Sequence, residues 1–188
     1  MFNNLHDGDN VFEFYYPSFD LAPIIKHFWA MSSDYSTEEV LVYPEGNAEL
    51  IFHFGEPFIN KSIGSNEVRR QTRAMLCCQK TIASFASASG STSMIAVTLT
   101  PIGAYSLFGF DLTEYKNTNI DLTCILGDKF NSVLDKLAEL DNNRERADEL
   151  ERFFRTKYKH VREADAVSRS ISLMSNSATK PDLGKLSK

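Results

Sequence analysis

The sequence predicts an α+β fold in which a small β-barrel or sandwich comes first and a helical subdomain follows it. Up to about residue 100, apolar side chains alternate with the period of two that is typical of strands, and beyond it they recur with helical spacing. The first 126 residues also hold 18 of the 22 aromatic side chains, which favour strands. The charge changes at the same place, because residues 1–126 have 14 acidic and 7 basic side chains whereas residues 127–188 have 11 and 13. A chain of 188 residues that is 43% hydrophobic can bury a core for such a fold.

The first strand-like segments lie between residues 11 and 31. Residues 11–15 alternate with period two, and the Tyr-Pro-Ser that follows breaks the pattern. Residues 21–25 have the spacing of a helical turn, which leads into an apolar run over residues 27–31. We expect a strand, a turn and a second strand.

Two hairpins are expected further along the chain. Residues 40–43 and 48–54 have strand patterns, and the Pro-Glu-Gly-Asn segment between them is typical of a turn. Residues 81–85 and 94–100 form the second pair, with the turn at Gly90 in a run of small residues. A further strand is expected near residues 74–78, and the polar stretch 55–70 is expected to be a loop.

Strand alternation assigns side chains to faces. Along residues 49–54, Leu50, Phe52 and Phe54 are expected on one face, and Glu49, Ile51 and His53 on the other. In the same way, residues 95, 97 and 99 share a face.

Helical spacing predicts three helices after Pro101. One begins at Gly127-Asp128, and a second begins at Asn142, whose side chain is suited to cap it. On this second helix, pairs of an acid and a base four residues apart join residue 148 to 152 and residue 151 to 155. A third helix is expected over residues 162–174.

The polar residues limit the function classes. Cys77, Cys78 and Cys124 are best explained as reduced thiols, with a redox role for the adjacent pair as the alternative. No spacing matches a metal site, so neither a metal nor another cofactor is expected. No segment has the ~20 apolar residues of a membrane span and none has a signal-peptide pattern, so the expected location is the cytoplasm, without membrane contact.

Several segments, in order, resemble the N-terminal domain of AraC-type bacterial transcription regulators, in the subgroup whose sensory region has no assigned ligand. The matching segments cover residues 14–175, and Cys78 departs from the small residue, commonly Gly, that the family has before Gln79. They are Tyr16-Pro-Ser to Leu21-Ala-Pro, Phe28-Trp29, Pro44-Glu-Gly-Asn-Ala-Glu-Leu-Ile-Phe52, Ala96-Val-Thr-Leu-Thr-Pro-Ile-Gly-Ala-Tyr-Ser-Leu-Phe-Gly-Phe110, Asp121-Leu122, Leu126-Gly127, Glu145-Arg146 and Leu150-Glu-Arg-Phe-Phe154.

The resemblance implies three regions. Residues 1–126 would be a cupin-like, β-rich domain that binds an unknown small-molecule effector, and residues 127–175 a helical dimerisation or linker subdomain. Residues 176–188 would be a linker and the start of a helix-turn-helix domain that this chain lacks. DNA would then be contacted only through that missing domain, and the partner of the chain would be a second copy, in a homodimer. The basic residues from Arg155 onward fit a linker that leads toward DNA.

The candidate effector site consists of Glu49 and His53, which share a strand face, with Trp29 and Tyr43 as lining residues. The alternatives are a solvent-facing polar edge for the first two residues and plain core packing for the aromatics. A cupin-type metalloenzyme is the least favoured reading, because two potential ligands do not make a metal site. We expect no catalytic residue and no enzyme activity.

The candidate dimer contact is an apolar stripe on the two helices between residues 128 and 158. The alternative is that both stripes pack on the barrel. For the function of the whole chain, the alternative to a sensory domain is a purely structural dimerisation or protein-interaction module. The stripe consists of Phe130, Val133, Leu134, Leu137, Leu150 and Phe154.

Overall fold

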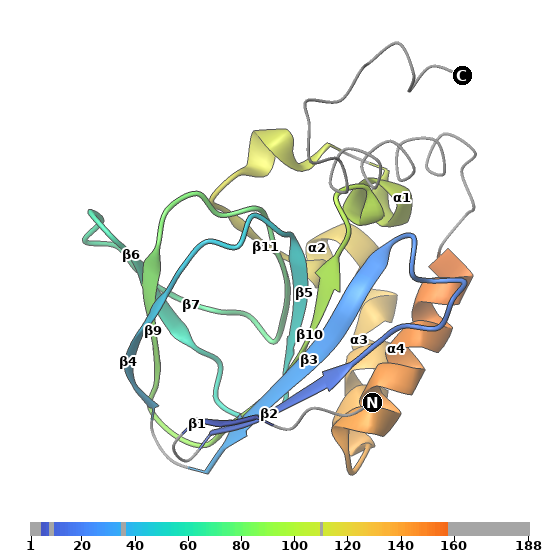
Figure 1. Ribbon diagram of the computed structural model, residues 1–188, viewed down its shortest axis with the longest axis horizontal. Helices are drawn as coiled ribbons and strands as arrows, with labels where there is room; N and C mark the ends of the chain where they lie inside the picture. The colour runs from blue at the N-terminus through green and yellow to red at the C-terminus, as the bar shows by residue number, and fades with distance from the viewer. Residues whose placement is uncertain (1–4, 8–9, 35–36, 110, 158–188) are drawn as a thin grey trace, which may run out of the picture.

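Two antiparallel β-sheets face each other across the molecule (Figure 1). The computed structural model describes residues 5–7, 10–34, 37–109 and 111–157. The larger sheet has seven strands, in the spatial order β1 (Leu5–Asp7), β2 (Asn10–Tyr15), β3 (Ile25–Ser33), β10 (Thr92–Leu99), β5 (Glu49–His53), β8 (Ala74–Cys77) and β11 (Asn119–Asp121). The smaller sheet has four strands, in the order β4 (Thr37–Val42), β9 (Ser84–Ala88), β6 (Ile59–Ser62) and β7 (Val68–Arg70).

Most of the helices follow the last strand and pack on the outer face of the larger sheet, whereas α1 (Gly103–Phe108) and the 3-10 turn η1 (Leu112–Tyr115) lie between β10 and β11 (Figure 1). The other α-helices are α2 (Leu122–Leu126), α3 (Asn131–Glu139) and α4 (Asn143–Lys157), and the other 3-10 turn is η2 (Asp128–Phe130). Strands followed by helices on one face confirm the α+β prediction. Within the described residues, none of the helices is both long enough and apolar enough to span a membrane.

The predicted strand faces are confirmed. Leu50 and Phe52 of β5 lie in the core on the helix side, together with residues 95, 97 and 99 of β10. Ile51 lies in a second apolar cluster, on the side that faces the smaller sheet. The helical turn before β3 is also present, because the amides of Ile24 and Ile25 both donate to the carbonyl oxygen of Leu21.

Both predicted hairpins are wrong. β4 pairs with β9 in the smaller sheet, whereas β5 pairs with β10 and β8 in the larger one, so the segment with Gly46 crosses between sheets instead of closing a hairpin. The strands of the second predicted hairpin are also in different sheets, because β9 pairs with β4 in the smaller sheet and β10 pairs with β3 in the larger one. The reason is that turn residues mark a change of chain direction but do not determine which strand the next segment pairs with, and both segments here cross from one sheet to the other. The stretch 55–70, expected as a loop, contains the short strands β6 and β7.

Most of the residues predicted to form a dimer contact are core residues. Five of the six are at most 3% exposed and one is partly buried, and all belong to the cluster that packs the helices against the sheet. They are Phe130, Val133, Leu134, Leu137, Leu150 and Phe154. These side chains are therefore not a surface open to a second copy, because the sheet already covers them.

The start of α4 is as predicted, since the side-chain Oδ1 of Asn142 accepts a hydrogen bond from the amide of Glu145 at 2.9 Å. Of the two ion pairs expected on this helix, Arg155 with Glu151 is present at 2.8 Å, but Arg152 pairs with Glu149 instead. The helix predicted to begin at Gly127 begins with the 3-10 turn η2. The third predicted helix and residues 176–188 lie outside the described residues.

Candidate ligand-binding face between the two sheets

The strand register places a row of polar side chains across the inner face of the larger sheet. Thr98 of β10 pairs with His27 of β3 and with Glu49 of β5, Glu49 pairs with Cys77 of β8, and Cys77 pairs with Asn119 of β11. Directly paired residues point to the same face of a sheet. We call these five residues the polar row.

A more apolar row runs beside it. Trp29, Ala96, Ile51 and Met75 are paired in the same way on four of these five strands, and they belong to the cluster of side chains between the sheets. The inner face therefore combines a polar and an apolar band, an arrangement suited to a small ligand that has both kinds of surface.

Two predicted site residues meet in this arrangement. The indole Nε1 of Trp29 donates to Oε1 of Glu49 at 3.0 Å, and the hydroxyl of the fully buried Thr98 donates to the same oxygen at 2.7 Å. Hydrogen bonds to a carboxylate are stronger than those between neutral groups. The Glu49 carboxylate is therefore held in a fixed position on the inner face.

His53 shares this face but lies at the other end of β5. The residue is 3% exposed, its Nε2 is 2.7 Å from Oε1 of Gln71, and its Nδ1 is buried without a partner among the described residues. Burial lowers the pKa of His53 below its usual 6.5, so the neutral imidazole is favoured. Since this residue is buried, the reading in which it forms a solvent-facing edge is wrong.

Tyr43 does not join the site. It follows β4 in the crossing between the sheets and is 71% exposed. An isolated exposed aromatic residue needs no functional explanation.

The space between the sheets is open to solvent along β4. Val40 and Val42 pair with Ala86 and Ser84 of β9, and Ser84 lines a pocket that Met75 of the opposite sheet also lines. The two valines therefore face inward, yet they are 54% and 47% exposed. Inner faces that close on each other would bury such side chains.

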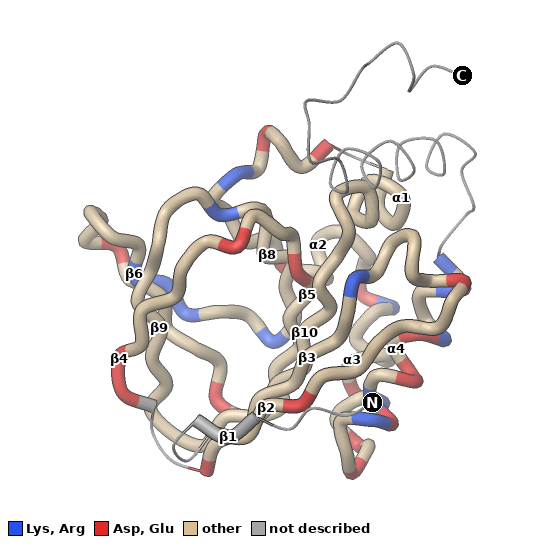
Figure 2. Tube along the Cα trace, viewed as in Figure 1, with Lys and Arg blue, Asp and Glu red and all other residues tan. Residues whose placement is uncertain are grey.

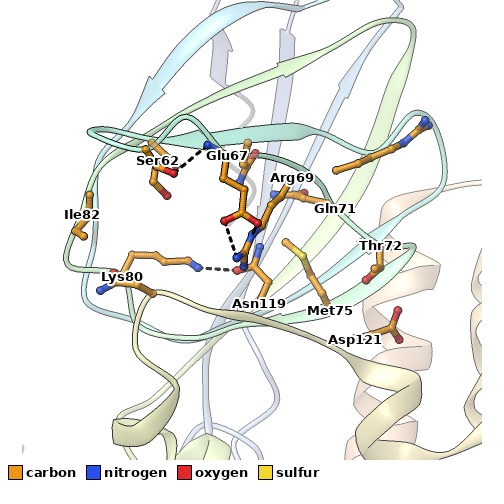
Figure 3. A pocket seen from close by; sticks show the side chains of 15 residues that line it. Ser62, Glu67, Arg69, Gln71, Thr72, Met75, Lys80, Ile82, Asn119 and Asp121 are labelled. Carbon is orange, nitrogen blue, oxygen red and sulfur yellow. Dashed lines mark hydrogen bonds and ion pairs between the residues drawn. The ribbon is translucent and has the colours of Figure 1, made fainter.

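The pocket that Ser84 and Met75 share has a volume of about 270 Å³ and lies where the two sheets end (Figure 3). Its walls include β7 and β6 of the smaller sheet and β8 and β11 of the larger one. Most of its lining is polar, with Asn60 and Arg69 on one side and Lys80 and Asn119 on the other. Sequence analysis missed this pocket, because its residues come from separate polar stretches that carry no motif.

Lys80 is the most distinctive residue of the pocket. Its Nζ donates to the carbonyl oxygen of Thr118 at 3.0 Å and to Oδ1 of Asn119 at 2.7 Å, and within the described part of the chain it forms no ion pair. Burial lowers the pKa of Lys80, and the charge of Arg69 lowers it further, while the two neighbouring thiols oppose the shift. An ammonium in this position is costly without an anion beside it.

The arginines of β7 line the same pocket, and Figure 2 marks the Lys and Arg positions along the chain in blue. Arg69 binds Glu67 through two hydrogen bonds, of 2.7 and 2.8 Å, and Arg70 binds Glu56 at 2.6 Å. The side chains of the first pair are 66% and 60% exposed, so this pair contributes little to stability and opens readily.

The cysteines are free thiols. Burial raises the pKa of Cys77 to about 11, so at neutral pH this residue is a thiol rather than a reactive thiolate. Among the described side chains, no group of three or more His, Cys, Asp and Glu residues is placed to hold a metal ion.

The family of the chain follows from its sequence. The model of a domain of unknown function, DUF6597, matches residues 13–121, more than half of the chain. The chain belongs to this family. The matched region of the DUF6597 domain begins in β2 and ends at Asp121 of β11, so it includes the polar row and the pocket. No curated protein matches the sequence significantly.

Solved structures are similar to parts of the DUF6597 chain. Hydroxypropylphosphonic acid epoxidase from S. wedmorenis is 12% identical, with a TM-score of 0.39 over 52% of this chain and 55% of that one. Ectoine synthase from P. lautus is 15% identical, with a TM-score of 0.39 over 54% and 72%. KdgF from Halomonas sp. is 9% identical, with a TM-score of 0.37 over 52% and 88%. The chain thus spans about half the length of the epoxidase, and likeness at this level carries no information on activity.

Proposed function

We propose that this chain is the cupin-like sensory domain of an AraC-type transcription regulator, and that it binds a small effector between its two sheets without catalysing a reaction. The observation that supports this most is the open inner face. Val40 and Val42 point inward yet stay about half exposed, opposite a sheet that carries a fixed carboxylate beside apolar side chains. A purely structural module has no need of such a face.

The helices on the outer face could couple effector binding to a change in the attached DNA-binding domains. β5 and β10 carry Glu49 and Thr98 on the inner face, and Leu50 and Val97 on the outer face, in the core that also contains residues of α3 and α4. An effector that shifts these central strands shifts the surface on which the helices pack. The regulator would then act as a homodimer whose DNA-binding domains lie outside this chain, provided that the effector binds the two arrangements unequally.

The tryptophan provides a direct test. Trp29 is the only tryptophan in the chain, and its indole is hydrogen-bonded at the proposed site, so its emission reports on occupancy of the inner face. We expect at least one compound of a metabolite library to change the Trp29 emission and raise the melting temperature in a saturable way. Val42→Arg should abolish both effects by filling the space between the sheets.

Val68→Arg is the matched control, because Val68 is 60% exposed and pairs with Lys61 on the outer face of the same sheet. In the full-length regulator, the same compound should change affinity for operator DNA. Absence of any saturable ligand would contradict the proposal and favour a structural dimerisation or interaction module. Stoichiometric metal in the purified protein would instead favour the metalloenzyme alternative.

A further inference from the structure

Lys80 is a half-buried cation that has no anionic partner among the described residues. Its two hydrogen bonds go to neutral oxygens, of Thr118 and Asn119, and neither supplies a negative charge. The acidic residues that line the pocket with it have other partners: Asp121 accepts two hydrogen bonds from Thr123 at the start of α2, and Glu67 is bound to an arginine. Within the described residues, the charge of Lys80 is thus left without a counter-ion in a partly desolvated site.

A second cation is close by and can be released. Arg69 lowers the pKa of Lys80 electrostatically, so the two positive groups already act on each other across the pocket. Among the described residues, Arg69 is bound by Glu67 alone, its neighbour two residues away in the chain, in an exposed pair (Figure 3). A guanidinium that already binds a carboxylate through two hydrogen bonds has the geometry to bind another oxyanion in the same way.

Asn60, which also lines the pocket, has a side-chain oxygen without a donor among the described residues. Oδ1 of Asn60 is buried and lacks a hydrogen-bond partner among the described residues, and Asn60 is paired with Arg69 across β6 and β7. Buried acceptors normally have a partner. If the Asn60 side chain turns toward the pocket, a ligand hydroxyl placed next to an anion between the two cations would provide one.

We propose that this pocket binds the oxyanion of a small acidic effector, a carboxylate or a phosphate, with Lys80 as the fixed cation and Arg69 leaving Glu67 to bind the ligand. The proposal rests on the proposed sensory function, for which it names the ligand class. Asn60 would accept a hydrogen bond from a hydroxyl of the same ligand, which favours hydroxy acids and phosphate esters over simple acids. The apolar body of the effector would extend along the inner face toward Met75.

Titration of this chain at constant ionic strength tests the proposal, with inorganic phosphate, succinate and the neutral succinamide as probes. We expect the melting temperature to rise with phosphate, with succinate or with both, and to stay constant with succinamide and with matched sodium chloride. Phosphate alone would identify a phosphate-bearing effector, and succinate alone a carboxylic acid. A response to neither anion would overturn the proposal.

Three variants identify the site. Lys80→Gln should weaken anion binding about tenfold or more, and Lys80→Arg should keep most of it because the charge remains. Glu67→Gln should strengthen binding, because it frees Arg69, and a merely structural role for the pocket would not produce this gain. Lys61→Gln is the control, since Lys61 is an exposed lysine of β6 that is paired with Phe85 on the other face of the sheet. Equal affinity in all four variants would place the bound anion elsewhere and overturn the proposal.

The two proposals fail separately. If neutral compounds bind and change operator affinity while anions do not bind, the anion pocket is wrong and the sensory function stands. If anions bind with the expected variant pattern but no ligand changes operator affinity of the full-length regulator, the pocket stands and the sensory function is wrong.

Discussion

Replacing Phe154 with alanine decides whether the stripe on α4 serves the core or a dimer. Phe154 is 1% exposed and packs in the main core, and truncation of such a side chain costs ~3–5 kcal/mol because it loses burial and leaves a cavity. In a domain of this size, 1 kcal/mol corresponds to about 2–4 °C. We therefore expect the melting temperature of Phe154→Ala to fall by about 6–20 °C.

Thermal unfolding followed by circular dichroism at several protein concentrations measures this. Phe19→Ala is the matched control, because Phe19 is 96% exposed and its loss should change stability by less than about 0.5 kcal/mol. The reasoning is refuted if the two variants melt together. It is also refuted if Phe154→Ala yields folded monomers from a dimeric parent, since the stripe would then belong to an interface between copies.

Three further predictions concern other sites. Gly103→Ala should destabilise the fold by about 1–3 kcal/mol or more, measured by urea unfolding, because a methyl group there would lie 2.2 Å from the carbonyl oxygen of Ile24. Glu49→Ala should lower the free energy of unfolding by about 1–3 kcal/mol and shift the tryptophan emission, because two donors lose their acceptor. Glu49→Gln should retain much of the stability, and equal losses of unfolding free energy in the two variants would contradict this. Burial holds the pKa of His53 below 6.5, so the unfolded chain binds the proton more tightly than the folded chain, and the free energy of unfolding should fall as the pH drops below about 6.5. Between about pH 7.5 and 5.5, this free energy should change less in His53→Gln than in the parent, and an equal change in both proteins would refute the reasoning.

The sequence predicted the sheet face on which each side chain lies better than it predicted which strands pair with each other. Alternation along β5 and β10 is a local property, so the sides on which Leu50 and Ile51 lie could be read directly. Strand pairing is a property of the whole chain. The turn residues around Gly46 signal a change of direction but not its destination, and here the chain leaves one sheet for the other.

The site was predicted in part for the same reason. Trp29 and Glu49 were both candidates, but the contact between them depends on β10, which lies between their strands in the sheet and comes later in the chain. Lys80 had no signal, because a lysine in a polar stretch is most often solvated. Only the fold shows that its ammonium is half-buried between the ends of two sheets.

The pocket lies between the edge strands of the two sheets. β7 is the last strand of the smaller sheet and β11 the last of the larger one, each has three residues, and both contribute side chains to the pocket. Backbone groups on the outer side of such end strands have no neighbouring strand to hydrogen-bond, and short end strands open more often than central ones. A ligand that bridges Arg69 of β7 and Lys80, whose ammonium donates to Asn119 of β11, would link one sheet to the other at this point, so its clearest signature would be slower amide hydrogen exchange in β7 and β11.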